Sequence, residues 1–553
     1  MALRQRRMGV LFAVFFLLLI AAAGRTLYFA AVRSATLRKA AQAQQLSTET
    51  LPAERGTITD RNGVDLAVSE PADDISADPF LLKDPLAVAE KLAPLLEKPR
   101  DEVLAELTQH SGFVYLAHAL NPARAHRILA LKIPGIDASV VMRRVYPRGS
   151  LAAQVLGLVG TEGKGLAGLE YSQDATLRGH PGQRRVVSDA LGHPISISTV
   201  HPEVPGSSLK LTIDSNIQQH TEDVLSAVGH VFSPRDATAI VMDPRSGAIY
   251  AMASWPRLND SITASVTNET LQNRAVSFDY EPGSTFKVVA ISGALQEGLV
   301  TPETSFSIPD QIQVADRTIH DDAPHPEESL TTSQILAQSS NVGAIKIGGL
   351  EGADRFNQWV HRFGFGSPTR VDLPGEEQGQ ALALDKYSGS SMGNLPIGQG
   401  ELVTPIQIAT AYSAIANGGI LRPPHIVKSV GGRSVAEPAG RRVVSSATAA
   451  EVRQMLKGVL APGGTASQVS VPGYQLAGKT GTASKIDPAT GQYSETAYVA
   501  SFVGFAPAAD PQLLCAVIVD EPKTGSIYGG AVAAPAFGEI MSFALPYLGI
   551  SPH

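Results

Sequence analysis

The sequence contains almost no cysteine and no concentrated block of positive charge. Cys515 is the one cysteine among 553 residues, so the chain cannot form an internal disulfide and its redox compartment cannot be inferred. Because Cys515 lies in an unbroken apolar run, we expect a buried strand rather than a reactive thiol there. Basic patches with interleaved aromatic residues are missing and the net charge is −7, which disfavours nucleic-acid binding.

Segments of low hydrophobicity, internal repeats and low-complexity tails are missing as well. These absences exclude a largely disordered chain and a repeat array. The composition, 44% hydrophobic and 18% charged, is that of a folded protein, and the length predicts several domains.

A long apolar run occurs only at the N-terminus. Residues 8–24 carry no charge, and the apolar pattern resumes after Arg25 as far as Val32, which is long enough for one membrane-spanning helix. The run exceeds the core of a usual signal peptide, so we expect an uncleaved anchor over residues 8–32. A signal cleaved at the alanine triplet inside the run is the alternative. The arginines within residues 1–7 predict a short tail on the inner side.

The region after the anchor is mixed in character. Residues 33–50 have helical spacing and predict a stalk that continues the anchor. Two short alternating runs joined by Asn62-Gly63 predict a hairpin. We expect residues 33–205 to form one irregular, strand-containing module.

From residue 206 onward the pattern becomes regular. Asp214 is placed to cap a helix, and helical patterns dominate from the segment around residue 284 to about 460. Strands are expected at 209–213, 237–242, 248–253, 474–482, 498–505 and 513–519. Strands, then helices, then strands that close one sheet are typical of an α+β domain, here over residues 206–553.

The chemically most informative pattern is Ser284-Thr285-Phe286-Lys287, at the start of an apolar helical run. A serine three residues before a lysine places hydroxyl and amine on one helix face, one turn apart. A lysine in that position can take the proton of the serine and make it a nucleophile. Taken alone the motif is a chance-level match.

Two further motifs follow in a fixed order. Ser339-x-Asn341 stands before a resumed helix, and Lys479-Thr480-Gly481 ends an extended run. The succession S-x-x-K, S-x-N and K-T-G within one strand–helix–strand domain is a strong joint signal for a serine acyltransferase.

With these motifs the chain resembles the class B penicillin-binding proteins, the peptidoglycan transpeptidases of bacteria. Other segments similar to that family are Arg55-Gly56, Asp60-Arg61-Asn62-Gly63, Arg144-x-Tyr146-Pro147, Gly168-Leu169-Glu170, Asp243-Pro244 and Gly398-Gln399-Gly400. The resemblance implies a domain of the penicillin-binding transpeptidase and serine β-lactamase kind, with an antiparallel sheet flanked by helices. It also implies an elongated, non-catalytic pedestal and one N-terminal transmembrane helix.

In such an enzyme Ser284 attacks the carbonyl of a penultimate D-alanine, and Lys287 is the base. Lys287 must then be neutral part of the time, and we expect burial and the second cation Lys479 to lower its pKa. Ser339 relays a proton towards the leaving amine, and Asn341 binds the amide backbone of the substrate.

The K-T-G segment is expected to bind the substrate's terminal carboxylate. Lys479 supplies charge and Thr480 and Thr482 supply hydroxyl donors, with Gly481 between them. By resemblance, the backbone N–H groups of Ser284 and Thr482 form the oxyanion hole.

Three other segments contain charged residues that could belong to a site. A second K-T-G begins at Lys523, but by resemblance the lysine stands on the strand before 498–505, which selects Lys479 and leaves Lys523 as a solvated loop residue. The histidines and aspartates of residues 320–325 occupy a proline-rich polar loop without metal-ligand spacing, so we expect a loop that solvates its charges. Arg144 either meets an anionic partner or packs within its own module, and we expect Glu170 to be structural.

The resulting expectation is a membrane-anchored D,D-transpeptidase of septal wall synthesis in cell division. Its parts are a cytoplasmic tail (1–7), an anchor (8–32), a dimerisation-like pedestal (33–205) and a transpeptidase domain (206–553) outside the bacterial cytoplasmic membrane. Expected partners are stem peptides, β-lactams, a polytopic glycan polymerase of the shape, elongation, division and sporulation family, and other division proteins. No metal, cofactor or nucleic acid is expected.

Three alternatives remain open at this point. The first is an elongation-specific transpeptidase of the same class. The second is a hydrolase with the same motifs, either a D,D-carboxypeptidase or a β-lactamase. The third is a non-enzymatic β-lactam sensor or scaffold.

Overall fold

The computed structural model describes residues 2–31, 46–188, 194–258 and 271–552. The chain divides into two compact units: Met1–Glu54, Pro71–Met142 and Gly179–Gly206 form one, and Arg55–Glu70, Arg143–Arg178 and Ser207–His553 form the other. Two pieces of the predicted 33–205 module, residues 55–70 and 143–178, thus cluster with the C-terminal part of the chain.

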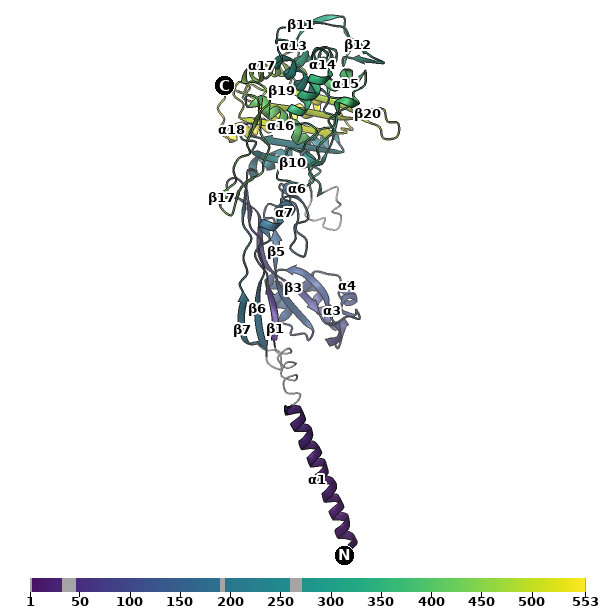
Figure 1. Cartoon of the computed structure of the whole chain (residues 1–553), viewed down its shortest axis with the longest axis vertical. Coiled ribbons are helices and arrows are strands. Elements are labelled where there is room, and N and C mark those ends of the chain that lie inside the picture. Colours follow the sequence, from purple (N-terminus) through teal and green to yellow (C-terminus); the bar gives the residue numbers. More distant parts are fainter. Residues whose placement is uncertain (1, 32–45, 189–193, 259–270, 553) are drawn as a thin grey trace. The chain divides into compact units, whose positions relative to one another are not determined.

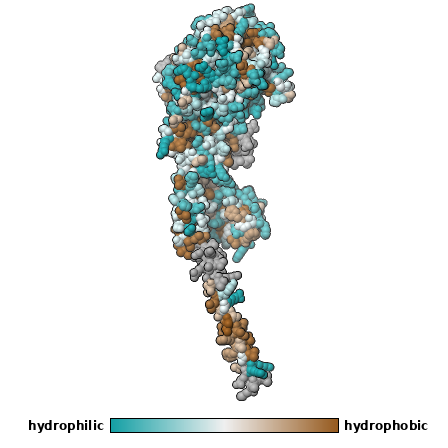
Figure 2. Space-filling model, in the orientation of Figure 1, coloured by the Kyte–Doolittle hydropathy of each residue, from teal (hydrophilic) through white to brown (hydrophobic). Residues whose placement is uncertain are grey.

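The first unit begins with helix α1 (Ala2–Ala31). Its segment Arg6–Ala31 is long and apolar enough to cross a membrane, and Figure 2 shows the apolar side chains exposed along it. Val32 and most of the predicted stalk lie outside the described residues. The end of that stalk is wrong as a helix: Leu46–Leu51 is strand β1, because its serine and threonines favour extended backbone and β6 offers a full ladder of partners.

The rest of the first unit has a small sheet and a small core. Strand β1 pairs antiparallel with β6 (Gly182–Ser188), which pairs with β7 (Pro194–His201). Apolar residues of α3 (Pro85–Leu96), α4 (Arg100–Leu107), β4 (Val114–Leu120) and α5 (Pro122–Leu129) form a separate core. The long strands β3 (Asp65–Ala77) and β5 (Ile136–Val145) contain residues of both units.

The second unit is built on a five-stranded antiparallel sheet in the order β10-β9-β21-β20-β19. The strands are β9 (Asp236–Met242), β10 (Ile249–Trp255), β19 (Ala477–Ile486), β20 (Tyr493–Ala506) and β21 (Leu513–Asp520). Strands from the two ends of the unit's sequence therefore lie side by side, teal and yellow in Figure 1. The predicted hairpin, the three C-terminal strands and the α+β class are confirmed.

Helices cover both faces of this sheet because its strands are apolar on both sides. Helices α9 (Ser215–Phe232) and α18 (Gly529–Tyr547) pack on one face, over one set of alternate strand residues. The other alternate set joins the core that includes α12 (Lys287–Gln296) and α16 (Pro405–Ala416). Cys515 is fully buried in β21, as predicted, and burial raises its thiol pKa.

The remaining elements complete the second unit. Its helices are α6 (Ala153–Leu156), α7 (Gly168–Ser172), α8 (Asp174–Leu177), α11 (Arg274–Ser277), α13 (Thr332–Gln338), α14 (Asn341–Arg362), α15 (Ser391–Asn394) and α17 (Ser446–Lys457). Its short strands are β2 (Ile58–Thr59), β8 (Leu209–Leu211), β11 (Ser305–Ile308), β12 (Gln311–Val314), β13 (Arg317–His320), β14 (Glu328–Thr331), β15 (Ile420–Leu421), β16 (Val427–Val430), β17 (Arg433–Ser434) and β18 (Arg441–Arg442).

The helical prediction up to residue 460 is wrong for the short strands within that stretch, β11 to β18. Each is only a few residues long, so alternation gives a weak sequence signal. The hairpin predicted at Asn62-Gly63 is confirmed, with Gly63 in the left-handed region between β2 and β3.

A buried ion cluster explains the arginine and glutamate motifs of residues 55–170. The carboxylate of Glu170 is fully buried, with Arg55 Nε 2.5 Å from one oxygen and Arg144 Nε 2.6 Å from the other. Arg144 also donates to the carbonyl of Gly56. The structure thus decides between the two alternatives for Arg144: it packs within its own unit, and Glu170 is structural.

Candidate active site

The nucleophile motif lies on a tight turn that leads into a buried helix. Ser284 is on the 3-10 turn η2 (Gly283–Phe286), and Lys287 begins α12. Ser284 is half-buried, whereas residues 281–283 and 285–290 are all buried. Two contacts stabilise the turn. Tyr412 on α16 donates to the carbonyl of Thr285 at 2.8 Å, and the ring of Phe286 packs on Phe365. One hydroxyl is therefore presented on an otherwise buried, rigid segment.

The amine of Lys287 is fully buried and faces the S-x-N motif. Its Nζ donates to the carbonyl and hydroxyl oxygens of Ser339 and, at 2.8 Å, to Asn341 Oδ1. The backbone N–H of Lys287 donates to the carbonyl of Ser284, but among the described residues no hydrogen bond joins their side chains. The structure thus places the two side chains at one site, without the direct contact that the S-x-x-K spacing predicted.

The S-x-N motif lies at a sharp corner between two helices. Ser339 caps α13 with φ of 66°, a left-handed conformation, and Asn341 is the first residue of α14. This corner turns both side chains towards Lys287. Ser339 Oγ accepts from Lys287 at 3.2 Å and from Lys479 at 2.8 Å, so one hydroxyl joins both lysines.

The K-T-G motif lies on β19, one of the two edge strands of the sheet. Edge strands leave backbone N–H and C=O groups unpaired on their outer side. A Cβ on Gly481 would lie 2.4 Å from Ser501 Oγ and 3.0 Å from the methyl group of Thr285, so only glycine lets the strand approach the nucleophile turn this closely. Gly481 therefore sets the approach, while Thr480 and Thr482 carry the hydroxyls.

These motifs line one cavity of about 320 Å³. Ser284 and Ser339 lie on it together with Thr480 and Thr482, and Asp322 completes the set of charged and nucleophilic groups. Thr480 Oγ1 is hydrogen-bonded to Thr465 Oγ1 at 2.6 Å, and Thr482 Oγ1 accepts from the N–H of Gly529 at 3.1 Å. The cavity therefore presents the hydroxyls of two serines and two threonines, and the two lysines are buried behind Ser339.

Burial controls the charge of the two lysines. Removal from water disfavours the ammonium form and lowers the pKa of Lys287 to about 8, while Asp322 and Asp321 act against that change. The pKa of Lys479 falls well below its ordinary value, through burial and then through repulsion by Lys287. The predicted lowering of the Lys287 pKa by burial is confirmed, and the predicted repulsion between the two amines is seen at Lys479.

The second K-T-G lies elsewhere in the unit. Lys479 is fully buried at the cavity, whereas Lys523 is exposed in a loop whose N–H groups bond to the carbonyl of Phe232. Among the motif segments, Gly398-Gln399-Gly400 also reaches the nucleophile: Gly283 N–H donates to Gly398 O, and Gly400 N–H donates to Glu281.

The polar loop at 320–325 does more than solvate its charges, and that prediction is wrong for Asp321. Its carboxylate accepts from the Ser340 hydroxyl at 2.8 Å and from the N–H groups of Asn341 and Val342 at the start of α14. Sequence reasoning missed this cap because Asp321 stands twenty residues before Asn341. In the described part of the chain, no group of three or more acidic, histidine or cysteine residues is arranged to hold a metal.

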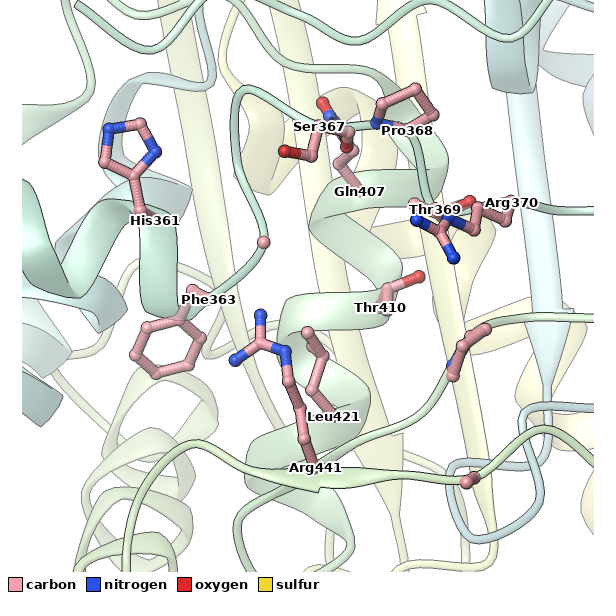
Figure 3. A pocket seen from close by; sticks show the side chains of 13 residues that line it. His361, Phe363, Ser367, Pro368, Thr369, Arg370, Gln407, Thr410, Leu421 and Arg441 are labelled. Atoms are coloured by element: carbon pink, nitrogen blue, oxygen red, sulfur yellow. Dashed lines mark hydrogen bonds between the residues drawn. The ribbon is translucent and has the colours of Figure 1, made fainter. Parts of the chain in front are cut away.

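A second cavity, of about 360 Å³, lies beside α16 and contains none of the predicted site residues. Figure 3 shows Arg441 directed into it, with Gln407 and Thr410 of α16 on another side.

Comparison with known proteins identifies penicillin-binding proteins as relatives over most of the chain. A family model for the penicillin binding protein transpeptidase domain matches residues 237–542, and one for the penicillin-binding protein dimerisation domain matches residues 50–211. The chain is 35% identical to penicillin-binding protein PbpB of Mycolicibacterium smegmatis, over 93% of this chain and 86% of that protein. It is 33% identical to peptidoglycan D,D-transpeptidase FtsI of Escherichia coli, over 98% and 91%.

A solved structure agrees in fold. Penicillin binding protein 3 of Mycobacterium tuberculosis, crystallised with aztreonam, matches with a TM-score of 0.72 and 31% identity, over 91% of this chain and 98% of that one. The resemblance drawn from the motifs is confirmed: the chain belongs to the penicillin-binding proteins, and its C-terminal part is a transpeptidase domain.

Proposed function

We propose that this protein is a membrane-anchored peptidoglycan D,D-transpeptidase that cross-links stem peptides during septal wall synthesis. One observation carries the proposal. Ser339 Oγ is shared between the buried amines of Lys287 and Lys479, on the cavity that holds Ser284. A hydroxyl between two buried amines is a route for protons beside a nucleophile, which is what acyl transfer needs.

Acylation starts when Ser284 Oγ attacks the carbonyl carbon of the penultimate D-alanine. The serine proton passes to neutral Lys287, and the Ser339 hydroxyl carries a proton on to the leaving amine. Asn341 is held by Asp321 at the start of α14 and orients the substrate's amide groups. Thr480, Thr482 and Lys479 bind the terminal carboxylate, and the N–H groups of Ser284 and Thr482 stabilise the oxyanion.

Deacylation reverses these roles with a different amine. The amine of a neighbouring stem peptide attacks the ester carbonyl, its proton passes to the lysine system, and Ser284 leaves as an alcohol. The new amide is the cross-link. A β-lactam acylates the same serine, because its strained amide lies where the peptide bond would lie.

The proposal also covers where the enzyme lies in the cell and which proteins it contacts. The apolar helix α1 anchors the chain in the bacterial cytoplasmic membrane, with residues 1–7 inside and the catalytic domain (206–553) outside. The pedestal (33–205) contacts a polytopic glycan polymerase and other division proteins. Septal action predicts that depletion yields filaments, whereas rounded cells would assign the enzyme to elongation.

Intact-protein mass spectrometry after exposure to benzylpenicillin tests the catalytic part. We expect one adduct on Ser284 that persists for many minutes, and none on Ser284→Ala. A rapidly lost adduct would identify a hydrolase instead. Growth supported by Ser284→Ala in depleted cells would identify a scaffold.

A further inference from the structure

Two adjacent carboxylates in the loop before α13 have very different surroundings. Asp321 is fully engaged, by the Ser340 hydroxyl, two backbone N–H groups and His325 Nε2 at 3.2 Å. Asp322 receives one long hydrogen bond, 3.4 Å from Asn341 Nδ2. In the described part of the chain Asp322 has no ion-pair partner. The neighbouring residues therefore serve different purposes, and capping α14 explains Asp321 alone.

Asp322 faces the reacting groups. It lines the same cavity as Ser284 and is the one acidic residue among the described residues that do so. Its charge reaches both buried lysines, since it opposes the lowering of each of their pKa values. Asp322 lies beside Asn341 of the S-x-N motif, whereas Thr480 and Thr482, which line the same cavity, stand on β19.

The lining of the cavity therefore combines two kinds of group. Strand β19 contributes hydroxyl donors, which suit a carboxylate, and Asp322 contributes an exposed carboxylate without an ion-pair partner among the described residues. An exposed anion that neighbours a nucleophile attracts a cationic group of the molecule bound there. Among the described residues neither lysine forms an ion pair with Asp322. Its carboxylate therefore stays available to a cationic group of a bound molecule.

We propose that Asp322 forms a subsite for an ammonium group of the substrate. The inference rests on the proposed function, and it specifies that the substrate group bound beside Asp322 is positively charged. The ammonium can belong to the side chain of the donor peptide or to the incoming acceptor. For an acceptor, the ammonium gives one proton to neutral Lys287, its nitrogen forms the C–N bond as the acyl C–O bond breaks, and its second proton goes to Ser284 Oγ.

The donor arm is tested by acylation with ampicillin, which carries an α-ammonium group, and with benzylpenicillin, which lacks it. The measured quantity is the ratio of their acylation rate constants. We expect Asp322→Asn to lower the ratio about two- to fivefold, the size of an exposed ion pair, and Asp322→Glu to preserve most of it. Taking a ratio cancels any change in Lys287 that both penicillins share.

The matched control is Asp316→Asn. Asp316 is exposed in the turn between β12 and β13 and does not line the cavity, so its removal deletes the same charge without touching the subsite. We expect its ratio to equal that of the unchanged protein. Benzylpenicillin acylation itself reports on Ser284, so loss of the proposed enzymatic function would be seen separately from loss of the subsite.

The acceptor arm uses a thioester donor and a diamine-bearing peptide acceptor. The acyl-enzyme partitions between the amine and water, and Asp322→Asn should lower the ratio of aminolysis to hydrolysis by a similar factor. A change in the first ratio alone assigns the ammonium to the donor, and a change in the second alone assigns it to the acceptor. If neither ratio moves, and only the pH profile shifts, Asp322 acts solely on the lysines and the proposal is overturned.

Discussion

Two buried charge clusters in the same unit behave in opposite ways. In the Arg–Glu–Arg cluster of Arg55, Glu170 and Arg144, each carboxylate oxygen meets one guanidinium at 2.5 or 2.6 Å. At the active site Lys287 and Lys479 are equally buried, yet neither forms an ion pair among the described residues. Burial is therefore compensated in the first cluster and left uncompensated in the second.

The cluster with paired charges stabilises the fold, whereas the cluster with unpaired lysines suits proton transfer. The compensated charges join segments that are far apart in the sequence. Uncompensated lysines lose part of their affinity for protons, which makes an amine available as a base near neutral pH. Substitutions in the two clusters should thus affect different measurements.

The largest expected effect is on the rate of acylation in Lys287→Met. Removing the base should reduce the rate constant for acylation by a fluorescent penicillin about 10³- to 10⁴-fold. The thermal unfolding midpoint should stay level or rise, because an apolar side chain replaces an uncompensated buried amine. A fall in the midpoint with acylation preserved would reverse the roles assigned to the clusters.

Glu170→Gln should affect stability instead. The buried Arg144 would lose its counter-charge and Arg55 would keep only Asp174, which costs about 3–5 kcal/mol in the free energy of unfolding. We expect a clear drop in the thermal unfolding midpoint and a normal acylation rate for protein that remains folded. Glu162→Gln is the matched control: Glu162 is 76% exposed in a surface pair with Lys164, so its midpoint should hardly move. Equal effects of the two substitutions would contradict the structural role of Glu170.

A smaller effect on the acylation rate is expected when the two K-T-G lysines are compared. Lys479→Ala should lower fluorescent-penicillin acylation about a hundredfold or more, because the bound carboxylate loses a buried charged partner. Lys523→Ala, in an exposed loop, should stay within about twofold. The reverse result would move the carboxylate site to the second motif.

The smallest expected effect is the change in the acylation rate constant for each pH unit. Only neutral Lys287 accepts the serine proton, and its pKa is lowered to about 8. The acylation rate constant should therefore rise about tenfold per pH unit below that value and level off above it. Asp322→Asn should shift the midpoint to lower pH, since Asp322 favours the charged lysine. A rate that falls between pH 6 and 8 would exclude the neutral amine as base.

Much of the fold and the site was predictable because its signals are local. Alternation marked β9, β10 and the C-terminal strands, and the three motifs named all the residues that meet around Ser339. Predictions failed where a distant partner decides the local structure. Residues 46–50 are predicted to end the helical stalk of residues 33–50, yet β6 pairs with them as a strand. The loop at 320–325 lacks any regular pattern, yet its aspartate caps a helix that begins at Asn341.

The sequence by itself determined the chemistry: a serine, two lysines, a second serine and an asparagine in an order that identifies a serine acyltransferase. The tertiary structure alone decided which aspartate caps a helix, which one lines the cavity, and how far the amines are from water. The physical reason is that proton affinity depends on burial and on neighbouring charge. Those neighbours, Lys479 and Asp322 for Lys287, come from segments that only folding brings together.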